Sequence, residues 1–278
     1  MKLAAQALVM DLLSAVGGRP ISVRALVRAA EVFDITENNL RVALARLLAS
    51  AKVERNERGL YGIGSEALPV QSHVSAWAEM ERRMVRWDGG FVGVHTAALE
   101  TGRRGAAERR ARALWFLGLR ELAGGLWVRP DNLRDGAAGV RSALSDLGFA
   151  AAAPVFALTD LDTATERRAR GLWNAAAIER GYEKTRAKLA ESGARLEEQP
   201  LRHAMVECFL LGGRAIRELA FDPLLPEPIV SGELRRGLID EMLRYDAAGR
   251  RVWRRFMHAE GAPELESLLG FRQLARVA

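Results

Sequence analysis

The chain has 278 residues, of which 49% are apolar, enough to fill the cores of two or three small structural units. Its 41 basic residues exceed its 35 acidic residues, which gives a formal charge of +6 and a sequence pI of about 10.0. This excess permits a nucleic-acid partner, although it equally fits a solvated, arginine-rich surface. The single cysteine, Cys208, excludes an internal disulfide and a cysteine-based metal cluster. The longest uncharged stretch, residues 147–159, is too short to span a bilayer, so we expect a cytoplasmic protein with no membrane partner.

The first 64 residues predict three helices and a hairpin. Apolar residues with helical spacing run through residues 5–16 and end at Gly17. Ser22 is placed to cap a helix over residues 24–33, and Thr36 to cap a third helix with a buried stripe of Leu40, Leu44 and Leu47. The segment VERNERGLYGIG, residues 53–64, then alternates around a charged tip and predicts a two-stranded wing. The order of these elements is that of a winged helix-turn-helix.

The central part predicts an alternation of strands and helices. Residues 65–86 predict a linker helix. Strands are then predicted at 91–96, 125–130 and 154–158, with helices at about 103–117 and 137–147. This order is one strand short of the βαββαβ pattern of a ferredoxin-like sandwich, and we expect the missing strand within these segments.

The rest of the chain predicts helices. They cover about residues 170–192, 202–219 and 232–258, with a proline-rich loop, FDPLLPEP, at 221–228. The predicted fold is therefore α+β, with an N-terminal winged helix-turn-helix (1–64), a linker helix (65–86), a central ferredoxin-like domain (87–160) and a C-terminal helical domain (161–278).

The third predicted helix carries the candidate DNA-binding side chains. In a helix-turn-helix the second helix of the pair enters the major groove, and its first residues reach the base edges. Asparagine suits adenine and arginine suits guanine, while a basic wing tip suits the DNA backbone or minor groove. We predict a DNA-binding set of Thr36, Asn38, Asn39, Arg41, Val42, Arg46, Arg55 and Arg58. Arg46 could instead pair with Glu37 or Glu31. Residues 1–64 hold nine Lys or Arg and six Asp or Glu, a net +3 that predicts only modest nonspecific binding.

Several separated segments resemble the PaaX family of bacterial repressors. They are ENNLRVALARL at 37–47, WDGGFVGVH at 87–95, ALWFLGLRELAGGLWVRPDNL at 113–133 and FDPLLPEP at 221–228. The resemblance implies a homodimeric repressor of a catabolic operon that binds operator DNA and leaves it when an acyl-CoA, typically an aryl-CoA, binds. An acyl-CoA needs cations for its phosphates and an apolar slot, and the candidate effector residues are Arg202, His203, Arg214 and Arg217.

Two alternatives belong to other classes. The winged helix could bind a protein instead of DNA, with its arginines serving as ordinary surface residues. A metal-dependent nuclease would use Asp88, but the family's usual acidic residue at the end of the first central strand is replaced here by His95 and Thr96. The four histidines lack metal-ligand spacing, and no serine, cysteine or lysine stands in a nucleophile motif. We therefore predict no enzyme activity, no bound metal and no cofactor.

Overall fold

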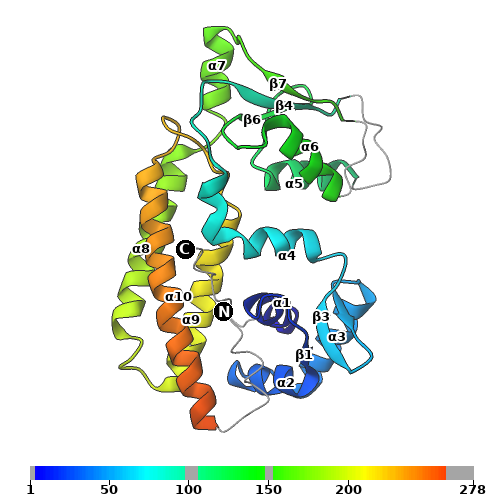
Figure 1. Ribbon diagram of the computed structural model, residues 1–278, viewed down its shortest axis with the longest axis vertical. Helices are drawn as coiled ribbons and strands as arrows, with labels where there is room; N and C mark the ends of the chain where they lie inside the picture. Colours follow the sequence, from blue (N-terminus) through cyan, green and yellow to red (C-terminus); the bar gives the residue numbers. More distant parts are fainter. Residues whose placement is uncertain (1–3, 98–105, 148–152, 261–278) are drawn as a thin grey trace. The chain divides into compact units, whose positions relative to one another are not determined.

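The computed structural model describes residues 4–97, 106–147 and 153–260 (Figure 1). These residues form two compact units. Unit 1 contains the described parts of residues 1–76, 187–217 and 240–278, and unit 2 contains those of residues 77–186 and 218–239. Helical segments from the second half of the chain belong to both units.

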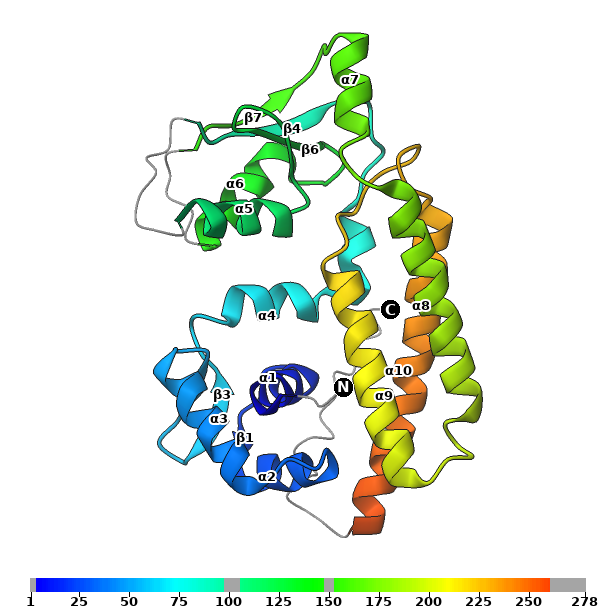
Figure 2. The ribbon, with the colours of Figure 1, turned by 180° about the vertical axis from the view of Figure 1, so that it is seen from behind.

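Unit 1 begins with three helices and a small sheet (Figure 2). The elements are α1 (Ala5–Ala15), β1 (Ile21–Ser22), α2 (Val23–Val32), α3 (Glu37–Ala49), β2 (Val53–Arg55) and β3 (Leu60–Ile63). The three strands are antiparallel in the order β1-β3-β2, with Ile21 opposite Tyr61 and Val53 opposite Ile63. The predicted three helices and hairpin are all present.

The local chemistry explains these boundaries. The Ser22 hydroxyl accepts a hydrogen bond from the Ala25 amide at 3.2 Å, and the Thr36 hydroxyl accepts one from the Asn39 amide at 3.4 Å. Each satisfies a backbone donor that the first turn of a helix leaves without a partner. The apolar stripes face one core, whose fully buried members include Leu8, Leu12, Leu26, Leu40 and Leu44.

Residues 65–86, predicted as a linker helix, contain two helical pieces. α4 (Leu68–Ser75) belongs to unit 1, and the 3₁₀ helix η1 (Trp77–Arg83) belongs to unit 2. Ala76 stands between them.

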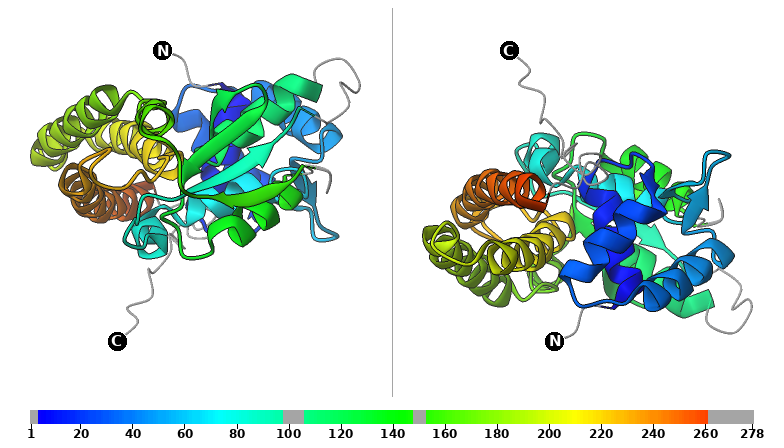
Figure 3. Two further views of the ribbon diagram at one scale, coloured as in Figure 1. Left: turned by 90° about the horizontal axis from the view of Figure 1, so that it is seen from above. Right: turned by 90° about the horizontal axis from the view of Figure 1, so that it is seen from below.

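Three long helices follow later in the chain, α8 (Ala175–Arg195), α9 (Leu201–Ala220) and α10 (Gly232–Glu260). Their parts in unit 1 lie side by side, as the end-on views show (Figure 3). Ser192 of α8 is buried and joins all three, because its hydroxyl donates to Glu207 of α9 at 2.7 Å and lies 2.8 Å from the Tyr245 hydroxyl of α10. A short helix, α7 (Thr163–Arg170), precedes α8 and was not predicted. Its signal was Asp162, whose carboxylate accepts hydrogen bonds from two amides of its first turn.

Unit 2 is built on a four-stranded antiparallel sheet. Its elements run β4 (Phe91–His95), α5 (Ala106–Phe116), β5 (Arg120–Ala123), β6 (Leu126–Pro130), α6 (Gly136–Asp146) and β7 (Val155–Leu158). The strand order is β5-β6-β4-β7. β5 supplies the strand that the sequence pattern lacked. The predicted start of α5 at about residue 103 lies outside the described residues.

Each face of this sheet has its own core. Helices α5 and α6 cover one face, where Val92 and Val94 pack with Leu114, Val140 and Leu144. On the other face Phe91 and Val128 pack with Ala169 of α7. The chain is thus an α+β protein with an N-terminal helical part bearing a small sheet, a central four-stranded antiparallel sheet and C-terminal helices. No helix within the described ranges is both long and apolar enough to cross a membrane.

Candidate functional site

The exposed face of α3 carries the candidate side chains near its N-terminus. Leu40, Leu44 and Leu47 are buried as predicted. The side chains on the outer surface include Thr36, Glu37, Asn38, Asn39, Arg41, Val42, Ala45 and Arg46. Val42 is 43% exposed, because it lies on the face of the helix opposite to the one that packs against the core. The outer face therefore offers amide, guanidinium and methyl groups together.

Arg41 is held by a weak intrahelical ion pair. Its guanidinium lies 2.6 Å from the Glu37 carboxylate one turn earlier, and both side chains are more than half exposed. An exposed pair at this spacing stabilises a helix by only about 0.3–0.5 kcal/mol. Arg41 can therefore leave Glu37 for another anion at small cost.

Arg46 lies beside a pocket of about 440 Å³. Asn39 and Val42 of the same helix line this pocket, together with the first turn of α1 and the turn between α2 and α3. The two carboxylates considered as partners for Arg46 are engaged elsewhere, since Glu37 pairs with Arg41 and Glu31 with Arg28. Within the described part of the chain Arg46 has no ion pair, so its charge faces solvent.

The hairpin tip is shaped by Asn56. Its side-chain oxygen accepts hydrogen bonds from the amides of Arg58 and Leu60, and Gly59 adopts a positive φ of 75°. The Arg55 guanidinium lies 5.8 Å from the centre of the Tyr61 ring, whereas the exposed Arg58 side chain projects from the turn. The two predicted hairpin arginines are therefore presented differently.

Within unit 1, α9 holds the turn that precedes α3. Arg202 donates hydrogen bonds to the backbone oxygens of Glu31 and Val32, at the C-terminus of α2, and pairs with Asp34 at 2.9 Å. Phe209 of α9 packs on Phe33 with ring centres 5.0 Å apart. These contacts fix the entry to α3 on the C-terminal helices.

The predicted effector residues do not form one cluster. Arg217 is paired with Asp11 of α1 at 2.9 Å, and Arg202 with the α2–α3 turn, while His203 and Arg214 are exposed. A helical rise of 1.5 Å per residue separates Arg202 from Arg217 by about 22 Å. The pair at 202–203 and the pair at 214–217 therefore could not hold the same phosphate group.

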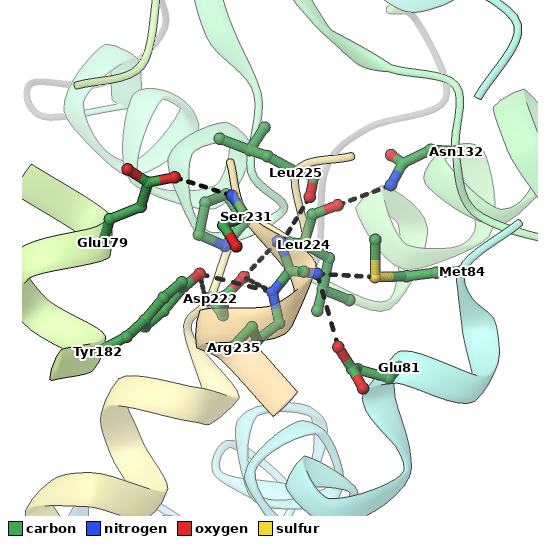
Figure 4. A network of polar contacts seen from close by, with 12 residues as sticks. Glu81, Met84, Asn132, Glu179, Tyr182, Asp222, Leu224, Leu225, Ser231 and Arg235 are labelled. Atoms are coloured by element: carbon green, nitrogen blue, oxygen red, sulfur yellow. Dashed lines mark hydrogen bonds and ion pairs between the residues drawn. The ribbon is translucent and has the colours of Figure 1, made fainter. Parts of the chain in front are cut away.

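Unit 2 contains a buried polar network that the sequence did not reveal (Figure 4). Arg235 of α10 is only 1% exposed, donates to the Leu225 backbone oxygen at 2.6 Å and lies 3.4 Å from the Asp222 carboxylate. The Tyr182 hydroxyl of α8 donates to that same carboxylate. Burial raises the pKa of Asp222, while the Arg235 charge and the Tyr182 hydrogen bond oppose that rise. Glu81 of η1 lies 3.8 Å from the Arg235 guanidinium.

A second buried pair continues this network toward the sheet. Arg129 of β6 donates to the backbone oxygens of Leu117 and Pro223, and the Asn132 side-chain amide donates to the Leu224 oxygen at 2.7 Å. Burial, more than any neighbouring charge, lowers the pKa of Arg129 to about 10. The segments WVRPDNL and FDPLLPEP each carry a charged or amide residue among apolar ones. That pattern could have indicated the network, because such residues are buried only when they have polar partners.

Asp88 and His95 are the two residues that bear on the nuclease alternative. The Asp88 carboxylate accepts a hydrogen bond from the Gly90 amide at 3.0 Å, and His95 is the half-buried last residue of β4. Among the residues described, no three His, Cys, Asp or Glu side chains gather in a way that could hold a metal ion.

Comparison with known proteins identifies the fold but no family. No known family description matches the chain, and no curated protein matches it. A solved structure, the uncharacterised protein Rv0674 from Mycobacterium tuberculosis, is similar with a TM-score of 0.56. The match has 21% sequence identity and covers 90% of this chain and 98% of that one. Nearly the whole arrangement of elements is thus shared with that protein.

Proposed function

We propose that the chain is a DNA-binding transcriptional regulator whose residues 1–64 act as a winged helix-turn-helix. In this proposal α2 and α3 are the helix-turn-helix pair, α3 is the recognition helix, and the hairpin of β2 and β3 is the wing. The observation that carries it is the outer face of α3, where amide, guanidinium and methyl groups are exposed on a helix whose opposite face is buried. The sheet of unit 2, with its β4-α5-β5-β6-α6-β7 order, we assign to the ferredoxin-like type.

The side chains on α3 match the chemistry of base edges. Asn38 or Asn39 pairs with adenine, Arg41 with guanine, and Val42 packs on a thymine methyl group. A good bidentate base contact discriminates against the wrong base by about 1–3 kcal/mol, several times the roughly 0.5 kcal/mol that holds Arg41 on Glu37. Arg41 therefore gains more by binding a guanine than it loses by leaving Glu37, and this difference favours the complex. Arg46, Arg55 and Arg58 are assigned to phosphates, which position the protein without reading sequence.

The finer identity that we propose is a repressor similar to the PaaX family. Two of the segments that carry the resemblance, WVRPDNL and FDPLLPEP, contribute buried polar side chains of unit 2, namely Arg129, Asn132 and Asp222. Replacing one member of a buried polar pair leaves the other without a partner, which is destabilising. This cost is a physical reason for polar residues at these positions. The resemblance further implies a homodimer on a palindromic operator and release by an acyl-CoA. Release requires the acyl-CoA to bind the DNA-free state more tightly.

The proposal is tested by titrating the purified protein against a fluorescent duplex of its own upstream intergenic DNA. Arg41→Ala is expected to weaken binding by about tenfold or more, and to relax specificity at one base pair. Arg180→Ala is the matched control, because Arg180 is an exposed arginine of α8 outside residues 1–64 and its loss changes the net charge equally. The control should bind within about twofold of wild type.

Three results separate the hypotheses. Sequence-specific binding lost in Arg41→Ala supports the regulator, and its reversal by one member of a panel of aromatic and aliphatic acyl-CoA thioesters supports the effector. Specific binding that no thioester reverses keeps the regulator and removes the acyl-CoA. If wild type and Arg41→Ala bind DNA equally, the regulator proposal fails and a protein-binding role for the winged helix takes its place.

A further inference from the structure

Unit 2 contains a pocket that none of the proposed DNA-binding residues lines. It has a volume of about 470 Å³ and is lined by Arg86, Trp87, Asp88, Gly89, Arg170, Glu227 and Pro228. The lining comes from three places in the sequence: the segment entering β4, the end of α7 and the loop before α10. Its volume falls within the range of about 300–1,000 Å³ typical of sites for small molecules.

The pocket wall offers a flat apolar surface with a cation already stacked on it. The Arg170 guanidinium lies 4.9 Å from the centre of the Trp87 ring, and Phe91 meets the same ring edge to face at 5.5 Å. The Trp87 indole N–H donates to the Gly90 backbone oxygen, which fixes the ring. Trp87 is thus a rigid platform, and Pro228 adds a second apolar surface.

The charges in the pocket are not equally available. Asp88 accepts from the Gly90 amide at 3.0 Å and Glu227 from the Gly232 amide at 3.1 Å, so both carboxylates have backbone donors. Arg170 uses two of its nitrogens on Glu166 of its own helix. Arg86 is exposed and, within the described ranges, has neither an ion-pair nor a hydrogen-bond partner. Arg86 is therefore the cation of this pocket that is free to bind an anion without first leaving another side chain.

These features point to one ligand class. The lining holds two arginines and two carboxylates, and Glu166, which pairs with Arg170, adds a third carboxylate, so a polyphosphate would meet more repulsion than attraction. A single carboxylate can accept two parallel hydrogen bonds from Arg86, while a flat apolar body packs on Pro228 and on the part of Trp87 that lines the pocket beside Arg170. We propose that this pocket binds a small monocarboxylic acid with a planar apolar body, held by Arg86 and Trp87. None of the α9 residues predicted to bind an acyl-CoA lines this pocket.

The test measures binding to the full-length protein without DNA, so its outcome does not depend on the proposed regulator function. Isothermal titration would use 2-naphthoate and benzoate as probes, the neutral 2-naphthamide to remove the charge, and inorganic phosphate to keep charge without the apolar body. Arg86→Gln is the diagnostic variant. Because Arg86 is exposed, this change should not impair folding, and Arg180→Gln is the matched control.

We expect 2-naphthoate to bind with one-to-one stoichiometry and a Kd of about 1 mM or tighter. Arg86→Gln should weaken it by about tenfold, as a charge-assisted hydrogen bond predicts, while Arg180→Gln should leave it unchanged. The amide and phosphate should each bind at least about tenfold more weakly. Absence of carboxylate binding up to about 10 mM overturns the inference, and so does binding that Arg86→Gln leaves unchanged.

Discussion

Replacing Asp222 with Asn removes one charge from the buried network of unit 2 while keeping the shape of the side chain. The Asp222 side chain is 2% exposed and the Arg235 side chain 1% exposed, so neither group is screened by water. In Asp222→Asn the guanidinium keeps the Leu225 oxygen but loses its nearest buried anion. The remaining carboxylate, that of Glu81, lies 3.8 Å away and is 27% exposed.

The expected loss follows from these contacts. Removing one partner of a buried ion pair destabilises a protein by about 3–5 kcal/mol. Because Glu81 compensates part of the charge, and an Asn oxygen can still accept from the Leu224 amide, we expect the lower end, about 3 kcal/mol. For a chain of this size that corresponds to a melting temperature lower by roughly 6–12 °C.

Urea denaturation followed by tryptophan fluorescence and far-ultraviolet circular dichroism measures this loss. The control is Asp240→Asn, an exposed carboxylate of α10, which should change the unfolding free energy by less than about 0.5 kcal/mol. A double-mutant cycle with Arg235→Met should give a coupling of at least about 1 kcal/mol. If Asp222→Asn costs under about 1 kcal/mol, or the cycle shows no coupling, the ion pair does not stabilise unit 2 as argued.

Three further predictions concern other parts of the chain. Leu44→Ala empties a buried position of α3 and should cost about 2–5 kcal/mol in chemical denaturation; a loss below about 1 kcal/mol would contradict the placement of Leu44 in the core. Gly93→Ala puts a methyl group about 2.6 Å from the Phe156 ring, so it should destabilise unit 2 by about 1–3 kcal/mol, and Phe156→Ala should relieve the clash. Burial and then the Asp88 charge raise the pKa of Asp131 above 3.8, so ionising this carboxyl costs more in the folded state than in the unfolded state. Asp131→Asn should therefore be more stable than wild type at pH 7, and this advantage should shrink as pH falls through the raised pKa toward 3.8; an advantage independent of pH would refute it.

The local part of the fold was predictable because its signals are local. Ser22 and Thr36 mark helix starts within three residues of the amides they bind, and the leucines of α3 repeat with the helical period. The outward direction of Arg41 and Val42 follows from that same period. The candidate DNA-binding face therefore follows from the order of residues in α3 alone.

Strand β5 shows where such local signals end. Its four residues, Arg120–Ala123, contain one large apolar side chain, Leu122, and lie at the edge of the sheet. An edge strand needs fewer buried residues than a central one, so the alternation of apolar and polar residues along it is weak. Pairing with β6 defines it, and that pairing is a tertiary property.

The sequence by itself determined the order of the elements in residues 1–64, the α+β class and the exposed face of α3, because caps and periodicity act over a few residues. Only the tertiary structure decided the partners of the buried polar groups. Asn132 binds an oxygen 92 residues away, Tyr182 binds Asp222 across 40 residues, and Arg202 binds Val32 across 170. No periodicity connects such positions. Burial forces each polar group to find a partner, but which partner it finds depends on how the chain packs.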